Sequence, residues 1–344
     1  MATGIPAGKS KAIFLTSGEE WASGKIADVY SRAEKERLSE MVELFAEAVS
    51  ARDLRAGKYA DVAREARFVF STWGMPAITA EEIRELLPKV EAVFYAAGTV
   101  QGFGRPFLAR GVRVVSAWAA NALPVAEFTL AQVLLGLKRT WWHARELREK
   151  GGPEAWRAMG VTGAYGSTVA LISLGMIGRR VAELLRPFDV KVIAYEPFGG
   201  DVEGVERVSL EECFLRGDVV SLHAPNLPTT RKMVTGAHLA AMKPYATFIN
   251  TARGAIVDAE GMFEVLRRRP DLTAVVDVAD PTEPPPAGSP FYTLANLVLT
   301  PHIAGSMGNE VERMAAYMVD ECGRLLRGEP LKYEVSLGML ETMA

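Results

Sequence analysis

Residues 168–178 join an apolar run to a glycine turn, in the order Thr-Val-Ala-Leu-Ile-Ser-Leu-Gly-Met-Ile-Gly. A helical pattern follows, and then a second apolar run that ends in Tyr195-Glu196-Pro197. A strand, a tight turn, a helix and a strand ending in a carboxylate predict a βαβ unit that binds a dinucleotide. Such a unit belongs to a doubly wound parallel sheet, so this feature constrains the fold of the chain.

The end of the second run indicates which dinucleotide the unit binds. A pyrophosphate is attracted to the N–H groups and the dipole at a helix N-terminus. Glu196 can accept both ribose hydroxyls of NAD and would repel the 2′-phosphate of NADP. No Arg or Lys follows in residues 197–200. We therefore expect NAD as the cofactor.

The glycine turn departs from the dinucleotide fingerprint G-x-G-x-x-G. Its first position is Ser173, and only Gly175 and Gly178 remain. The first glycine permits the tight turn, so a Cβ there is expected to shift the loop or tilt the cofactor. The alternative is a plain strand–turn–helix unit with no ligand.

Composition limits the class of protein. A chain of 344 residues with 49% hydrophobic and 24% charged residues is typical of a two-domain globular protein. The formal net charge of −3 gives no field for nucleic acid or an anionic membrane. No 18-residue window is uncharged and apolar, and no signal-peptide pattern begins the chain. Cys213 and Cys322 are far apart and lack CxxC spacing, so we expect free thiols, a cytoplasmic location and no metal.

Apolar runs alternate with helical patterns along the chain, which predicts α/β architecture with two Rossmann-like domains. The expected strands are Lys11–Thr16, Phe68–Ser71, Ala92–Tyr95, Val112–Val115, Thr168–Ser173, Val190–Tyr195, Val219–Leu222, Ala246–Asn250, Thr273–Asp277 and Leu297–Thr300. The expected helices include 79–87, 122–139 and 309–327, with a capping box at 209–212 and an Asp258 cap. The last helix should pack back on the first domain. This gives a discontinuous substrate-binding domain, 1–121 with 306–344, and a NAD-binding domain, 122–305.

Three expected strand ends carry groups suited to proton transfer on an anionic substrate. Arg253 follows one strand, Asp277 ends the next, and His302 follows the last. Arginine offers a planar fork for a carboxylate, and histidine titrates near neutrality. A neighbouring carboxylate would stabilise the imidazolium, and Glu283 is the nearest candidate.

These segments resemble the D-isomer-specific 2-hydroxyacid dehydrogenases. The resemblance rests on Leu299-Thr-Pro-His-Ile-Ala-Gly305, on Asn250-Thr-Ala-Arg-Gly-Ala-Ile-Val-Asp258, on Asn121-Ala-Leu-Pro-Val-Ala-Glu127 and on the variant glycine turn, in the family's order. It implies two domains with the active site in the cleft between them, and doubly wound parallel sheets. Arg253 would bind the substrate's carboxylate and carbonyl oxygen, His302 would exchange the proton, and Glu283 would pair with the imidazole.

The resemblance also implies the remaining binding residues. Met176 and Ile177 would present N–H groups to the pyrophosphate, His223 would line the adenine side, and Asp277 would take the carboxamide. The full cofactor-binding set is Gly175, Met176, Ile177, Glu196, His223, Thr251, Ala252, Asp277, Ala304 and Gly305. For the substrate the set is Arg253 with Gly98 and Thr99, whose loop would receive the carboxylate, and Trp73 as a further wall.

The function that follows is NAD-dependent interconversion of a small-molecule 2-oxo acid and a (R)-2-hydroxy acid.

Family members often place the paired Glu at the position of Thr282, so Glu283 requires the loop before it to accommodate one inserted residue. Ala96 stands where phosphoglycerate-type members have Arg, which argues against that substrate. The alternative functions are an NAD(H)-binding corepressor-like regulator, a phosphoglycerate-type dehydrogenase and a formate-type dehydrogenase. Relatives form a homodimer through the region that corresponds to Trp141, Trp142 and the stretch to Tyr165. Trp118 would be a second wall of the substrate pocket.

Overall fold

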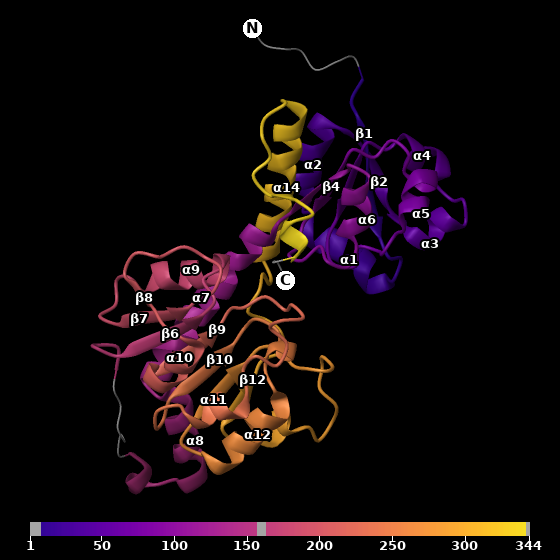
Figure 1. The fold of residues 1–344 in the computed structure, drawn as a ribbon. Coiled ribbons are helices and arrows are strands. Elements are labelled where there is room, and N and C mark those ends of the chain that lie inside the picture. The colour runs from indigo at the N-terminus through magenta and orange to yellow at the C-terminus, as the bar shows by residue number, and fades with distance from the viewer. Residues whose placement is uncertain (1–7, 157–162, 342–344) are drawn as a thin grey trace. The chain divides into compact units, whose positions relative to one another are not determined.

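A computed structural model describes residues 8–156 and 163–341 of the chain. The chain forms two compact units, residues 1–121 with 306–344 (unit 1) and residues 122–305 (unit 2). These bounds coincide with the expected domains, whose substrate and cofactor roles remain predictions. Each unit contains a largely parallel sheet with helices packed on it (Figure 1), which confirms the predicted α/β class.

Unit 1 has a six-stranded sheet in the order β13-β5-β4-β3-β1-β2, in which β13 alone runs antiparallel to its neighbour. Its strands are β1 (Lys11–Thr16), β2 (Glu43–Ser50), β3 (Phe68–Ser71), β4 (Ala92–Tyr95), β5 (Arg113–Ser116) and β13 (Glu334–Val335). Alternate residues of β1 and β3 enter two different apolar clusters, one on each face of the sheet. Both faces are therefore covered, which explains why these strands read as continuous apolar runs.

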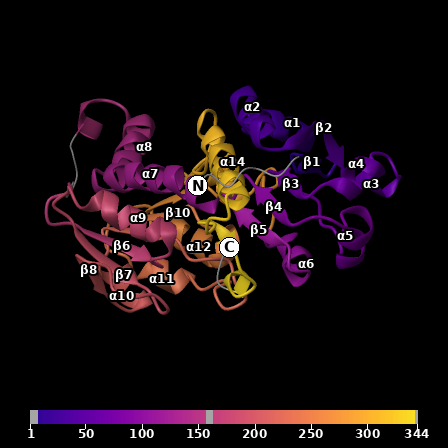
Figure 2. The same cartoon turned by 90° about the horizontal axis from the view of Figure 1, so that it is seen from above.

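The helices of unit 1 lie on both faces of this sheet. They are α1 (Glu20–Val29), α2 (Arg32–Met41), α3 (Ala51–Arg55), α4 (Ala60–Glu65), α5 (Ala80–Leu86), α6 (Gly104–Ala109), α14 (Glu310–Leu326) and a 3₁₀ turn at Met339–Glu341. The last long helix, α14, packs against α1 and α2 and over β4 and β5 (Figures 1 and 2). The prediction that this helix returns to the first domain is confirmed.

Unit 2 has a seven-stranded parallel sheet in the order β12-β11-β10-β9-β6-β7-β8. Its strands are β6 (Thr168–Ile172), β7 (Lys191–Tyr195), β8 (Val205–Arg207), β9 (Val219–Leu222), β10 (Thr247–Asn250), β11 (Thr273–Val276) and β12 (Leu297–Leu299). The chain winds outward from β6 in one direction and from β9 in the other. The carboxyl ends of β6 and β9 therefore form the switch point at which doubly wound sheets bind ligands.

Helix α7 (Trp118–Leu137) carries the chain from unit 1 into unit 2. It is long and apolar enough to cross a membrane by composition, but 56% of its apolar window is buried in the fold, as in a core helix. The other helices of unit 2 are α8 (Thr140–Lys150), α9 (Met176–Leu185), α10 (Leu210–Arg216), α11 (Gly236–Ala240), α12 (Ala259–Arg268) and α13 (Pro290–Thr293), with 3₁₀ turns at Pro153–Trp156 and Gly254–Ile256.

The sequence signals for helix starts and for strands were confirmed at some positions and wrong at others. The capping box at Ser209 and Glu212 is present, because each side chain bonds the other residue's backbone N–H. Asp258 occupies the N-cap of α12 but makes no capping bond, so that prediction is wrong. Strand β2 was not expected, because Glu43 and Glu47 interrupt its apolar pattern; it pairs only with β1, at the sheet edge.

Candidate active site

The turn between β6 and α9 approaches the switch point closely. Ser173 has a φ of +78°, a left-handed backbone conformation that favours glycine. A Cβ at Gly178 would lie 2.1 Å from the Ser173 carbonyl oxygen, so α9 can pack on this turn only with glycine there. A Cβ at Gly175, the N-cap residue of α9, would meet nothing within 4 Å. The helix N-terminus with Met176 and Ile177 is thus open to an anion.

Glu196 stands at the end of β7, where the sequence places the ribose acceptor. Its Oε2 accepts from the N–H of Leu174 at 2.6 Å and from the Ser173 hydroxyl at 3.3 Å. Its Oε1 accepts from the N–H groups of Phe198 and Gly199 at 2.8 and 2.9 Å. Burial alone would raise the pKa of Glu196, but these hydrogen bonds together hold the pKa below its usual value. The carboxylate is therefore ionised and fixed in direction.

His223 follows β9 on the other side of the switch point. Its backbone N–H donates to the Ile172 carbonyl at 2.8 Å. The residue is 8% exposed, and both ring nitrogens are buried without a hydrogen-bond partner among the described residues. Burial lowers the pKa of His223 to about 4, so the ring is neutral at pH 7. A neutral, unpartnered imidazole beside the glycine turn fits the wall of a nucleotide site, so the residues present fit NAD.

Arg253 follows β10 in a turn braced by Asn250, whose side chain bonds the backbone of Ala252 and Arg253. Desolvation by burial lowers the pKa of Arg253, while the negative charge of Glu283 opposes that change. A Cβ at Gly254 would lie 2.2 Å from the carbonyl carbon of Ala279. Only glycine lets this turn touch the loop that leads to Glu283.

Glu283 and His302 lie together at the ends of the following strands. Glu283 Oε2 is 2.8 Å from His302 Nδ1, and Glu283 Oε1 accepts from the Ala279 N–H at 2.7 Å. The loop from Asp280 to Thr282 thus accommodates the extra residue. With Nδ1 facing a carboxylate, the Nε2 side of the ring is left for a substrate.

Asp277 organises the turn that carries His302. Its Oδ1 accepts from the Thr300 hydroxyl at 2.6 Å and the Ile303 N–H at 2.9 Å, and its Oδ2 accepts from the Ala304 N–H at 2.8 Å. His302 has a φ of +55° within this turn. Asp277 therefore positions the imidazole; its contact with a nicotinamide carboxamide remains a prediction.

The other expected cofactor residues lie at the same edge of the unit 2 sheet. Thr251 is buried, and its hydroxyl is 3.2 Å from that of Thr129 on α7. Ala252 and Ala304 are also buried, and Gly305 is half-buried. Within the described residues, no three His, Cys, Asp or Glu side chains are grouped as a metal site would require.

The expected substrate residues outside Arg253 lie in unit 1. Gly98 and Thr99 follow β4, and the Ser116 hydroxyl donates to the carbonyls of Ala97 and Gly98. Trp73 follows β3, is half-buried and packs against both apolar clusters of unit 1. All three residues stand at the carboxyl edge of their sheet, on loops held by the strands that precede them.

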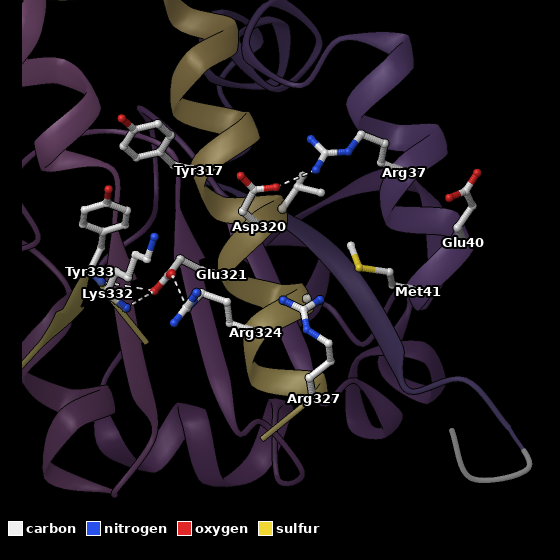
Figure 3. Close-up of a pocket in the computed structure, with 12 residues that line it drawn as sticks. Arg37, Glu40, Met41, Tyr317, Asp320, Glu321, Arg324, Arg327, Lys332 and Tyr333 are labelled. Atoms are coloured by element: carbon white, nitrogen blue, oxygen red, sulfur yellow. Dashed lines mark hydrogen bonds and ion pairs between the residues drawn. The ribbon is translucent and has the colours of Figure 1, made fainter. Parts of the chain in front are cut away.

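A hollow of about 480 Å³ lies elsewhere in unit 1, between α2 and α14 (Figure 3). Arg37 pairs with Asp320 at 2.5 Å, and Arg327 pairs with Glu329 at 2.7 Å. Buried Glu321 accepts from the backbone N–H groups of Lys332 and Tyr333. These charges are balanced within the protein, and the hollow contains none of the expected site residues.

Sequence reasoning missed groups that surround Glu196. Arg207 donates to the Glu196 carbonyl, and Arg179 donates to the Gly200 carbonyl at 3.3 Å. Residues 197–200 lack a cation, but the fold brings these two guanidinium groups to that loop. Arg179 lies in the first turn of α9, a position that the fingerprint could have indicated.

Comparison with known proteins agrees with this geometry. Residues 130–304 match the family model described as "D-isomer specific 2-hydroxyacid dehydrogenase, NAD binding domain". A D-3-phosphoglycerate dehydrogenase of Methanocaldococcus jannaschii is 32% identical over 226 residues, which are 64% of this chain and 42% of that protein. The chain thus spans less than half the length of that relative.

Two further matches extend over more of both chains. A glyoxylate reductase of Korarchaeum cryptofilum is 31% identical over 256 residues, covering 72% of this chain and 76% of that protein. The crystal structure of TT0316 protein from Thermus thermophilus superposes with a TM-score of 0.71 at 29% identity, covering 94% of this chain and 99% of that chain. Because the family model covers half of the chain and this relative matches 72% of it, the chain belongs to the D-isomer specific 2-hydroxyacid dehydrogenase family.

Proposed function

We propose that this protein is an NAD-dependent oxidoreductase that interconverts a 2-oxo acid and a (R)-2-hydroxy acid. The observation that carries the proposal is the Glu283–His302 pair, 2.8 Å apart and joined through Gly254 and Ala279 to the Arg253 turn. An acid–base pair beside a half-buried guanidinium suits a substrate with a carboxylate and a neighbouring oxygen that gains or loses a proton.

In the proposed reduction, Arg253 binds the substrate's carboxylate and polarises its carbonyl group. His302 donates a proton from Nε2 to the carbonyl oxygen, and Glu283 stabilises the imidazolium through Nδ1. Bound NADH supplies the hydride that the carbonyl carbon receives. In oxidation, His302 removes the hydroxyl proton. The loop with Gly98 and Thr99 is expected to bind the substrate's carboxylate as well.

Glu196 supports NADH over NADPH, because an ionised and fixed carboxylate would repel a 2′-phosphate. The guanidinium groups of Arg207 and Arg179 that reach this loop already donate to main-chain carbonyls. The substrate loop supports a small oxo acid over a phosphorylated one, since residues 96–99 contain no cation. A regulator that only senses NAD(H) has no use for an acid–base pair. A formate dehydrogenase has no use for a proton relay.

The test is to mix the protein with NADH or NADPH and one oxo acid at a time, and to record the loss of cofactor absorbance. The oxo acids are glyoxylate, hydroxypyruvate, pyruvate, phenylpyruvate and bulkier ones. We expect turnover of at least one oxo acid, with NADH preferred. Binding of NADH without turnover of any acid would instead favour the sensor. Oxidation of formate by this protein with NAD as the hydride acceptor would favour a formate dehydrogenase.

A homodimer and a cytoplasmic location also remain proposals. Trp141 donates to Gln132 at 3.1 Å, and the ring of Trp142 packs edge-on against Tyr245 within unit 2. Residues 157–162 of the expected interface lie outside the described residues. Sedimentation of the full chain tests the dimer.

A further inference from the structure

Ser173 is the one fingerprint position of this chain that departs from glycine, and its backbone has a left-handed conformation that favours glycine. Its φ of +78° is one that side-chain-bearing residues rarely adopt. A serine in such a position is maintained against a local steric cost, so its hydroxyl is the feature to explain.

The hydroxyl contacts the residue expected to hold the ribose. Ser173 Oγ is 3.3 Å from Glu196 Oε2, across the pair of strands β6 and β7. Three main-chain N–H groups also bond this carboxylate, from Leu174, Phe198 and Gly199. A carboxylate has about four acceptor positions, so donors from the protein occupy all of them.

A ribose hydroxyl that approaches Glu196 therefore meets an acceptor that is already filled. The three N–H donors are parts of the main chain and keep their directions. The Ser173 hydroxyl differs, because its oxygen retains two lone pairs of its own while its hydrogen points to the carboxylate. Donation to a charged acceptor also makes that oxygen a stronger acceptor.

We infer that Ser173 and Glu196 form a composite acceptor for the adenosine ribose, in which a ribose hydroxyl donates to Ser173 Oγ while Ser173 donates to Glu196. The inference rests on the proposed function, since it requires a bound NAD(H). It assigns to a side chain a contact that a glycine at this position cannot make.

The test is a thermodynamic cycle between the serine hydroxyl and the ribose hydroxyls. The full-length protein and its variants Ser173→Ala and Ser173→Gly are titrated by fluorescence with NADH and with analogues that lack the 2′- or 3′-hydroxyl of the adenosine ribose. We expect each variant to bind NADH about threefold to tenfold more weakly, the range for one hydrogen bond. In the wild type, removal of one of the two ribose hydroxyls should weaken binding. In the two variants this loss of affinity should be smaller by the same factor.

The two variants separate the effect of the hydroxyl group on NADH affinity from the effect of the backbone conformation. Ser173→Ala keeps the Cβ in the left-handed turn, whereas Ser173→Gly removes it, so equal losses of affinity assign the effect to the hydroxyl. Ser221→Ala is the matched control, because Ser221 lies in β9 and its buried hydroxyl has no partner among the described residues. It should leave every dissociation constant unchanged.

The inference is overturned if the deoxy penalties are the same in the wild type and in Ser173→Ala, or if either variant binds NADH as tightly as the wild type. Wild-type protein that binds NADH but shows no such coupling refutes this inference alone. Wild-type protein that binds no NADH refutes the proposed function as well.

Discussion

The two units share one architecture, but the carboxyl edges of their sheets carry different chemistry. In unit 2 this edge has five ionisable side chains that the fold uses: Glu196, Arg253, Asp277, Glu283 and His302. In unit 1 the first residues after β1, β3, β4 and β5 are Ser17, Thr72, Ala96 and Ala117, and the nearest ionisable side chain is Glu19, at the N-cap of α1. If the proposed function is correct, unit 2 would supply the charges and the proton transfer, and unit 1 would supply shape and main-chain groups.

The hydroxyl groups of unit 1 are used within the protein. Ser71 donates to the Leu15 carbonyl, and Thr72 donates to the Ala96 carbonyl. These bonds link the ends of neighbouring strands and hold their loops in place. A substrate there would meet main-chain N–H groups and apolar walls such as Trp73.

The largest effect should come from the imidazole of unit 2. His302→Ala should lower the turnover number about 10²- to 10⁴-fold, the usual contribution of a positioned acid–base group, while NADH still binds. Steady-state rates with the best oxo acid and a fluorescence titration with NADH measure the two quantities. Full activity in this variant would remove the acid–base role from unit 2.

The second effect concerns the stability of unit 2 in acid. The pKa of His223 is about 4 in the fold against an ordinary 6.5, so its contribution to stability is present above pH 6.5 and is lost as the pH falls toward 4. The loss is about 3 kcal/mol by linkage.

Denaturant unfolding at pH 7 and pH 4.5 should show most of this loss, roughly 2 kcal/mol. His223→Leu should lose less stability over that interval than the wild type, and only in the transition of unit 2. An equal loss in both proteins would show that the buried ring is not the cause.

Arg253→Lys should raise the Michaelis constant of the oxo acid by about tenfold, because a point charge cannot form the two parallel bonds of a guanidinium. Its effect on the Kd of NADH should be small. Initial rates over a range of substrate concentrations check this. An unchanged Michaelis constant would place recognition of the carboxylate in unit 1 and reverse the comparison.

The smallest effect is expected in unit 1. Thr99→Val should change the Michaelis constant by no more than about threefold, because the loop is expected to bind through its main chain and a neutral side-chain hydrogen bond contributes little. The same rate measurements apply. A change as large as that of Arg253→Lys would show that side chains of unit 1 also read the substrate.

The sequence predicted the parts that depend on continuous local patterns. Strands buried on both faces, such as Thr273–Val276, appear as apolar runs, and the Glu283–His302 pair follows from motif order. Strand β2 was missed because an edge strand with glutamates has no such run. The four donors on Glu196 and the approach of Arg207 depend on how β6, β7 and β8 pack, which no local pattern encodes.

Gly254 has a consequence for engineering. Since a Cβ there would lie 2.2 Å from the Ala279 carbonyl carbon, main-chain contact sets the separation between the guanidinium turn and the acid–base loop. Any residue other than glycine at position 254 would force them apart, so libraries should leave that codon fixed.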